Sequence, residues 1–201
     1  MSILVKFPKR KSLSEEQLIG LLVEKNEIAF RHLVHLYENK IYNTVISFLR
    51  SEEYADDVTQ EVFISIYQSI ESFRKESSLS TWIHRIAVTK TLEFLRKQNR
   101  KKRWGALYSL WGDDLSPKFE AVSYDHPGVA LENKQTSEAL FKALDRLPTT
   151  QRTAFTLHKI DGHSYDETAQ IMNNSISAIE SLVHRATSNL RKYLADYYKN
   201  L

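Results

Sequence analysis

The sequence contains no cysteine, only five glycines and four prolines, and no long run of hydrophobic residues. Without cysteine, the chain can form no disulfide framework, thiol nucleophile or thiolate metal site. The scarcity of glycine and proline disfavours an all-β chain, which needs many tight turns. No apolar run approaches the ~20 residues that a membrane-spanning helix needs. We therefore expect a cytoplasmic, helical protein without membrane insertion.

The composition allows a packed core, and the charged residues are distributed unevenly along the chain. The chain has 201 residues, enough for one large domain or two small ones, and 42% of them are hydrophobic. The net charge is only +3, but ten lysines and arginines fall between Phe73 and Arg103, where only Glu76 and Glu93 oppose them. Trp82 lies near the start of this basic stretch. Cations beside an aromatic side chain suit single-stranded nucleic acid, although a core tryptophan beside a solvated basic helix end gives the same pattern.

Hydrophobic spacing predicts an all-α fold with two helical domains joined by a flexible acidic linker. Apolar residues recur every three or four positions, which is typical of amphipathic helices. The linker is predicted where this period is lost among glycines, prolines and acidic residues. The predicted parts are an N-terminal helical domain over 1–103, a linker over 104–131 and a C-terminal domain over 132–201. Helices are predicted at about 14–25, 27–50, 54–70, 80–103, 132–146 and 151–160.

The stretch from Tyr165 to Lys192 has the pattern of a helix-turn-helix. Ser164, followed three residues later by Glu167, predicts a capping box at the start of its first helix. Asn173 can adopt the left-handed conformation that a sharp turn requires. Ile179 is expected to fill the gap between the two helices.

The second helix of this motif has a polar face opposite its apolar stripe. Its side chains are small or hydrogen-bonding, as a helix that enters a DNA groove would carry. A helical hairpin with a solvated face would have the same pattern, so this stretch alone leaves both interpretations open. The candidate DNA-contacting residues are Ser177, Glu180, Ser181, His184 and Arg185.

A second polar cluster falls in the N-terminal half of the helix predicted at about 54–70, where Asp56, Asp57, Gln60 and Glu61 gather. Carboxylates there can stabilise the helix dipole and face solvent, which the spacing alone favours. They can also form an acidic docking face for a basic partner. In a nucleic-acid-processing enzyme, Asp56, Asp57 and Glu61 would be metal ligands, but no second acidic cluster converges with them.

Two separated segments resemble one known family. The first is DDVTQEVFISIYQSIESFRKESSLSTWIHRIAV, residues 56–88. The second is LPTTQRTAFTLHKIDGHSYDETAQIM, residues 147–172, continued by SAIESLVHRATSNLRKYL, residues 177–194. Together they resemble a bacterial RNA polymerase sigma factor of the sigma-70 family and the extracytoplasmic-function (ECF) type. The resemblance covers most of the chain outside the N-terminal tail and the linker.

The resemblance implies a transcription initiation factor that is not an enzyme, needs no cofactor or metal, and binds core RNA polymerase and promoter DNA. The acidic helix would dock on the β′ clamp helices, and the β flap would be a further contact. The linker would thread near the RNA exit path. Whether an anti-sigma factor also binds the chain stays open. The expected docking residues are Asp56, Asp57, Gln60, Glu61 and Phe63.

The family also implies two promoter contacts. The final helix would lie in the major groove of the −35 element. The loop after residue 72 and the start of the following helix would read and melt the −10 element, with Arg85 and Lys90 on phosphates. The expected −10 residues are Phe73, Arg74, Lys75, Ser77, Ser78, Thr81, Trp82, Arg85, Thr89 and Lys90.

Two positions depart from the family pattern. Thr89 stands where an asparagine is common, and Glu180 where a basic residue often begins the base-reading face. A carboxylate cannot donate to guanine but can accept from the cytosine amino group. The alternative function is a stand-alone helix-turn-helix transcriptional regulator, which would account for residues 131–201 but not for the acidic and basic helices before them.

Overall fold

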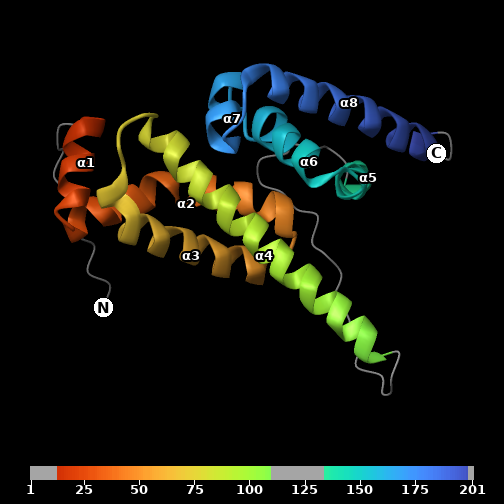
Figure 1. Ribbon diagram of the computed structural model, residues 1–201, viewed down its shortest axis with the longest axis horizontal. Helices are drawn as coiled ribbons and strands as arrows, with labels where there is room; N and C mark the ends of the chain where they lie inside the picture. Colours follow the sequence, from red (N-terminus) through yellow and green to blue (C-terminus); the bar gives the residue numbers. More distant parts are fainter. Residues whose placement is uncertain (1–12, 110–133, 199–201) are drawn as a thin grey trace.

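The computed structural model describes residues 13–109 and 134–198, and all regular structure within those two ranges is helical. The predicted all-α fold is therefore confirmed (Figure 1). The helices are α1 (Glu15–Val23), α2 (Glu27–Leu49), α3 (Glu52–Ser69), the 3₁₀ turn η1 (Ile70–Ser72), α4 (Leu79–Ser109), α5 (Lys134–Asp145), α6 (Thr149–Phe155), the π-helical turn η2 (Thr156–Ile160), α7 (Tyr165–Met172) and α8 (Ile176–Tyr198).

Polar side chains fix where the first three helices begin. Ser14 accepts a hydrogen bond from the Gln17 amide at 3.2 Å and forms a capping box with it. Asn26 accepts from two amides at the start of α2. Ser51 accepts from the Tyr54 amide, so α3 begins at Glu52. Residues 51–53, which were expected to lie outside the helix, are therefore its cap and its acidic first turn.

Helices α1 to α4 enclose the core of the N-terminal domain. Their apolar stripes face one another, as the three- and four-residue spacing predicts. Phe63 packs edge-on against Phe30, with ring centroids 6.5 Å apart, and joins the same core. The side chains that are fully shielded from solvent include Leu33, Ile41, Val45, Val62, Ile66 and Ile83.

Helices α7 and α8 form the predicted helix-turn-helix. The capping box of Ser164 and Glu167 is present. Asn173 adopts the left-handed conformation with φ 51°, and backbone bonds to the Ala169 and Gln170 carbonyls close the end of α7. Ile179 is fully buried between the helices. All three local predictions for this motif are confirmed.

Other helix bounds differ from the predictions. Helix α4 begins at Leu79, one residue before the predicted start, and Ser78 caps it, because the Ser78 Oγ accepts the Thr81 amide at 3.1 Å. Helix α4 continues past residue 103 to Ser109, and 110–131 of the expected linker lie outside the described residues. Helix α6 begins at Thr149, two residues before the predicted start, and Pro148 is its N-cap, without a side-chain capping bond. The final residues of the predicted helix at 151–160 form the π-helical turn η2.

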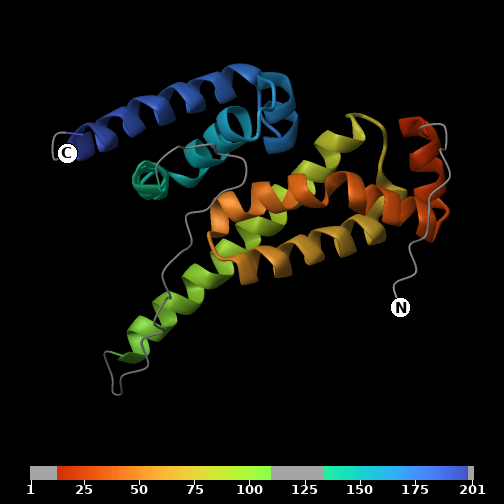
Figure 2. The same cartoon turned by 180° about the vertical axis from the view of Figure 1, so that it is seen from behind.

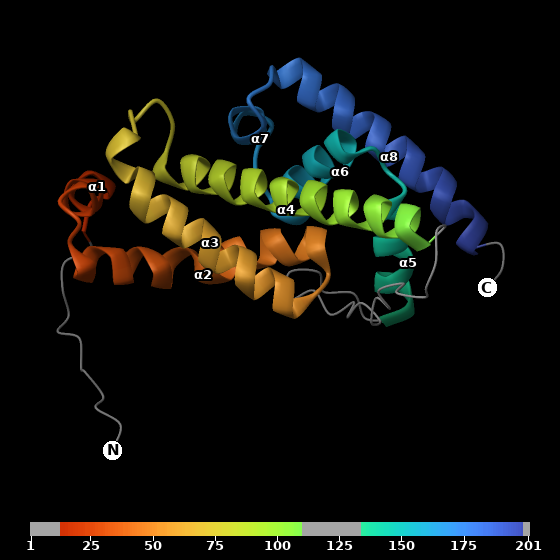
Figure 3. The same ribbon diagram turned by 60° about the horizontal axis from the view of Figure 1, so that its bottom comes forward.

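Helix α4 lies between the two domains. One side packs on α2 and α3, and another side packs on α7 (Figure 3). The reverse view places α6, α7 and α8 together on the far side of α4 from α3 (Figure 2). Val88 and Leu92 of α4 form an apolar cluster with Leu157, Ile171 and Met172 of the C-terminal domain. The two domains are thus in contact along α4.

Substitution Ile179→Ala should lower the free energy of unfolding by about 2–5 kcal/mol, because it leaves a cavity between α7 and α8. Urea unfolding followed by circular dichroism measures this loss. Ile176→Ala is the matched control, since Ile176 lies in the same helix but is 46% exposed. Equal losses in the two variants would contradict the assigned packing.

Candidate nucleic-acid interface

The polar face of α8 is open to solvent. Arg185 Nε donates to the Ser181 carbonyl at 3.2 Å, which holds the guanidinium along the helix surface. Four neighbouring side chains line a shallow hollow, and Ser177 lies exposed one turn before them. The structure therefore brings the five predicted −35 residues onto one accessible face. The hollow is lined by Glu180, Ser181, His184 and Arg185.

The apolar residues of the predicted −10 region lie at one end of the N-terminal domain. The Phe73 and Trp82 rings are 5.2 Å apart and inclined by 46°. Both side chains are half-buried and pack against the core, so each ring offers only part of its surface. Trp82 was expected either to pack in the core or to contact nucleic acid. Its ring packs on the core and also keeps an exposed part, so both remain open to it.

The serine and threonine residues of this region stabilise the loop itself. Ser78 Oγ contacts Thr81 Oγ1 at 2.9 Å in addition to capping α4. Thr81 is only 3% exposed. Ser77 Oγ donates to the Ser78 carbonyl at 3.3 Å. Glu15 of α1 accepts the Leu79 amide at 3.1 Å, so α1 also holds the loop. These bonds give Ser78 and Thr81 a structural role at the helix start.

The cations of this region differ in their surroundings. Lys75 has φ 58° and forms an ion pair with Glu16 at 4.0 Å. Lys90 forms a similar pair with Glu93. Arg74 and Thr89 are exposed, and Thr89 Oγ1 donates to the Arg85 carbonyl at 2.8 Å.

Arg85 connects the predicted −10 surface to the helix-turn-helix. Its guanidinium donates to the Gln170 carbonyl through Nη2 and through Nε, the latter at 3.1 Å. Gln170 lies in the last turn of α7, where a cation is favoured by the helix dipole. One predicted phosphate contact is therefore engaged by the other domain in this structure.

The acidic face of α3 is exposed at all four of its polar positions, Asp56, Asp57, Gln60 and Glu61. Phe63 differs from these four, because its side chain is only 8% exposed and serves the core. Ile64 was not singled out from the sequence, yet it is 56% exposed and lies one turn after Gln60 on the same face. The sequence could have indicated Ile64, because it is an apolar residue that falls outside the buried stripe of α3.

Titratable groups are buried where the C-terminal domain contacts α2 and α4. Burial raises the pKa of Asp161 to about 7, against a smaller opposite effect of its 2.9 Å hydrogen bond from Thr44. Burial, followed by the nearby His84, lowers the pKa of His163 to about 4. The two imidazole rings are 4.5 Å apart, and burial also lowers the pKa of His84.

These shifts act in opposite directions on the domain contact. The Asp161 carboxyl is more easily buried when protonated, so its penalty grows as pH rises from its ordinary pKa of 3.8 to about 7. His163 is more easily buried when neutral, so its penalty grows as pH falls from 6.5 to about 4. Between pH 4 and 6.5 the two effects oppose each other.

Two further classes of site were sought in residues 13–109 and 134–198. The histidine, aspartate and glutamate side chains there form no group of three or more that could hold a metal ion, so Asp56, Asp57 and Glu61 gain no support as metal ligands. None of the helices described combines the length and apolar character needed to cross a membrane.

Comparison with known proteins decides the family. Residues 33–101 match the family model of sigma-70 region 2, and residues 137–190 match that of sigma-70 region 4. The ECF RNA polymerase sigma-E factor of Haemophilus influenzae is 30% identical over 88% of this chain and 93% of its own length. The chain belongs to the sigma-70 family and is an ECF sigma factor. The sigma-E factor of Escherichia coli K12 is 28% identical over the same share of this chain.

Solved structures agree with this fold. CnrH, in complex with the cytosolic domain of CnrY, aligns with a TM-score of 0.65 over 90% of this chain and 97% of its own, at 22% identity. RpoE of Bartonella quintana, in complex with the anti-sigma factor NepR, aligns with a TM-score of 0.61 over 83% of this chain and 96% of its own, at 25% identity. As a sigma factor, the protein directs promoter-specific transcription initiation through regions 2 and 4.

Substitution Ser78→Ala should destabilise the sigma factor by about 1 kcal/mol, since it removes the side-chain cap of α4. Thermal unfolding followed by circular dichroism measures the change. Ser77→Ala is the control, because Ser77 accepts no capping bond in the structure, and it should alter stability by less than about 0.5 kcal/mol. If the two variants were equally stable, the structural role assigned to Ser78 would be wrong.

Proposed function

We propose that this ECF sigma factor acts without catalysing a reaction of its own, in the cytoplasm, through three surfaces. The polar face of α8 reads the −35 element. The loop before α4, together with the exposed start of α4, reads and melts the −10 element. The acidic face of α3 docks on the β′ clamp helices of core RNA polymerase, and the β flap is a further contact. The observation that carries the proposal is that one chain exposes all three surfaces on separate helices.

Two observations support the proposed −35 surface: one side of α8 is packed in a hydrophobic core, and the opposite side is exposed. Ile179 and Val183 anchor one side of the helix, which leaves the opposite side free to enter a major groove. Arg185 can donate to phosphate or to a guanine. Glu180 can accept from a cytosine amino group but cannot donate to guanine, so we propose that it selects cytosine at its position.

The −10 surface is supported by the combination of an aromatic pair and cations. Flipping a base out of a duplex costs a few kcal/mol, which stacking and phosphate contacts must offset. The partly exposed rings of Phe73 and Trp82 can stack on or wedge against a base. Arg74 and Lys75 lie between these two residues in the sequence, and Lys90 follows Trp82 by eight positions. The hydrogen bonds of Ser78 and Thr81 stabilise the conformation of this loop.

Run-off transcription with core polymerase on fragmented genomic DNA tests the function. Discrete transcripts should appear only when both proteins are present. Arg185→Ala and His184→Ala should each reduce −35-dependent initiation about tenfold, the effect of losing one good base or phosphate contact. Permanganate reactivity of the −10 region, per complex formed, should persist in both variants.

Arg31→Ala is the control for these variants, because Arg31 is an exposed arginine outside all three surfaces. Tight, specific promoter binding by the protein alone would favour the stand-alone regulator instead. Loss of −10 melting without loss of −35 dependence would refute the assignment of α8.

Substitution Asp57→Lys should weaken binding to core polymerase about tenfold, because it places a like charge against a basic partner surface. Affinity can be measured by fluorescence anisotropy with the labelled sigma factor. Glu38→Lys makes the same charge change at an exposed position of α2 and should leave affinity unchanged. Unchanged affinity of Asp57→Lys would contradict the docking role, and the acidic residues would then only stabilise the helix dipole and face solvent.

A further inference from the structure

Helix α1 lies against both ends of the segment that connects α3 to α4. This segment consists of η1 and of residues 73–78, which are called the −10 loop here. Figure 1 and Figure 3 both place α1 beside the point where α3 ends and α4 begins. The buried side chains of α1 join the core that also contains Ile70 and Leu79, at the two ends of this segment. They are Leu18, Ile19 and Leu22. Hydrophobic burial therefore holds α1 in place independently of its charged residues.

The start of α4 takes its acidic partner from α1. The first amide groups of a helix lack intrahelical partners, and a carboxylate is favoured beside them. The first turn of α4 contains no acidic residue. Glu15 of α1 instead accepts the Leu79 amide through Oε1 at 3.1 Å, while Ser78 accepts the Thr81 amide. The start of α4 is thus bonded to a carboxylate that lies 64 positions away in the sequence.

The end of α3 takes its cation from the other end of α1. The last carbonyl groups of a helix favour a nearby cation, but the last turn of α3 contains no basic residue. Lys25 follows α1 in the left-handed conformation, with φ 58°, and its Nζ donates to the Tyr67 carbonyl at 2.6 Å. The same ammonium group forms an ion pair with Glu71 of η1 at 3.1 Å. It also lies over the Tyr67 ring, 4.9 Å from the centroid.

These contacts act on the position of two helix ends. Exposed ion pairs contribute little stability on their own, and Glu71 is 63% exposed in its side chain. Glu15 and Lys25, however, bond to backbone groups, and the helix that carries them is already packed in the core. Helix α1 has nine residues and is about 14 Å long, so it sets the separation between the end of α3 and the start of α4. The −10 loop spans that separation.

We propose that α1 is a positioning element for −10 recognition, in which Glu15 and Lys25 hold the two helix ends at the separation that the −10 loop requires. Residues 33–101 match the model of sigma-70 region 2, so α1 lies outside the matched segment. A flipped base must be captured at a fixed place, and a small displacement of the capturing groups lowers selectivity. This role rests on the proposed function of the −10 loop, while the hold on the helix ends is a property of the protein alone.

The first readout is amide hydrogen exchange in the protein alone, measured at Leu79 by nuclear magnetic resonance. Glu15→Ala removes the acceptor and its charge and should speed exchange of the Leu79 amide at least about threefold. Glu15→Gln keeps an acceptor oxygen and should give an intermediate rate. Glu16→Ala removes a carboxylate from the same turn of α1, where Glu16 forms only an exposed 4.0 Å ion pair with Lys75, and should leave the Leu79 rate unchanged.

The second readout is the selectivity of the complex with core polymerase at the −10 element. The initial rate of open-complex formation is compared between a promoter found by run-off transcription and the same promoter with one −10 base changed. Partial unfolding of a variant lowers both rates equally and leaves their ratio unchanged. Glu15→Ala and Lys25→Ala should each lower the ratio about threefold, the effect of one lost charge-assisted bond at a partly exposed site.

The controls separate this role from a general loss of activity. The corresponding ratio for a changed −35 base should stay constant in both variants. Lys25→Arg keeps a cation beside the Tyr67 carbonyl and should restore most of the −10 ratio. Arg31→Ala removes an exposed cation from α2 and should change neither ratio.

Three results would overturn the positioning role. An unchanged Leu79 exchange rate in Glu15→Ala would refute the hold of α1 on α4. Faster exchange with an unchanged −10 ratio would show that the hold does not serve recognition. An equal fall in the −10 and −35 ratios would show that the effect is not confined to the −10 loop. If the unchanged protein gave no −10 selectivity with polymerase, the proposed function would fail, and the exchange rates would still decide whether α1 holds the helix ends.

Discussion

The burial of α4 on two sides is the constraint on which the rest of the structure depends. Ile83 and Ala87 face the core formed with α2 and α3, while Val88 faces Leu157 of the C-terminal domain. Once two sides of α4 are covered, little of its surface remains for the recognition residues proposed on it. The polar positions that stay accessible are those of its remaining face, which include Thr89. The packing of the domains and the accessible part of the proposed −10 surface are therefore set by the same helix.

Local rules predicted much of the fold and of the −35 surface. The capping box of Ser164, the left-handed Asn173 and the buried Ile179 depend on residues within a few positions of one another, and all were predicted from their order in the sequence. The roles of the surfaces, which spacing alone left open, were predicted from the family resemblance and stay predictions. The face of α8 was predicted because one amphipathic period determines both its buried and its exposed side.

The contacts between the domains could not be predicted in the same way. Arg50 and Asp145 are 95 positions apart, and each resembles an ordinary surface charge in its own segment. The π-helical turn η2 contains the fully buried Leu157 and has no residue signature of its own. The start of α3 was misplaced because its acidic first turn was interpreted as a break, although Ser51 is a helix cap. The contacts between the domains thus arise from tertiary structure, whereas the start of α3 is set by a local side-chain cap.

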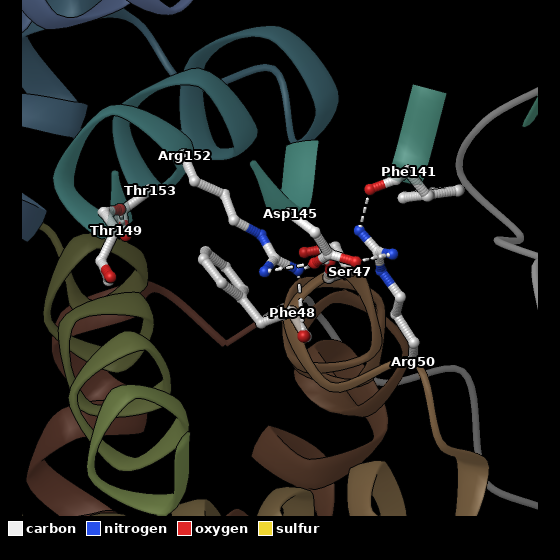
Figure 4. A network of polar contacts seen from close by, with 8 residues as sticks. All are labelled: Ser47, Phe48, Arg50, Phe141, Asp145, Thr149, Arg152 and Thr153. Carbon is white, nitrogen blue, oxygen red and sulfur yellow. Dashed lines mark hydrogen bonds and ion pairs between the residues drawn. The ribbon is translucent and has the colours of Figure 1, made fainter. Parts of the chain in front are cut away.

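Arg50 serves two parts of the structure, the turn that ends α2 and the contact with α5 (Figure 4). It adopts the left-handed conformation with φ 57°, which costs a residue with a side chain about 1 kcal/mol and which glycine adopts freely. An arginine stands at this turn, and its guanidinium reaches α5 of the other domain. The side chain at position 50 therefore serves the contact with the other domain at a cost to the turn that ends α2. Glycine would relieve that turn, but it would remove both the hydrogen bond to the Phe141 carbonyl and the ion pair with Asp145.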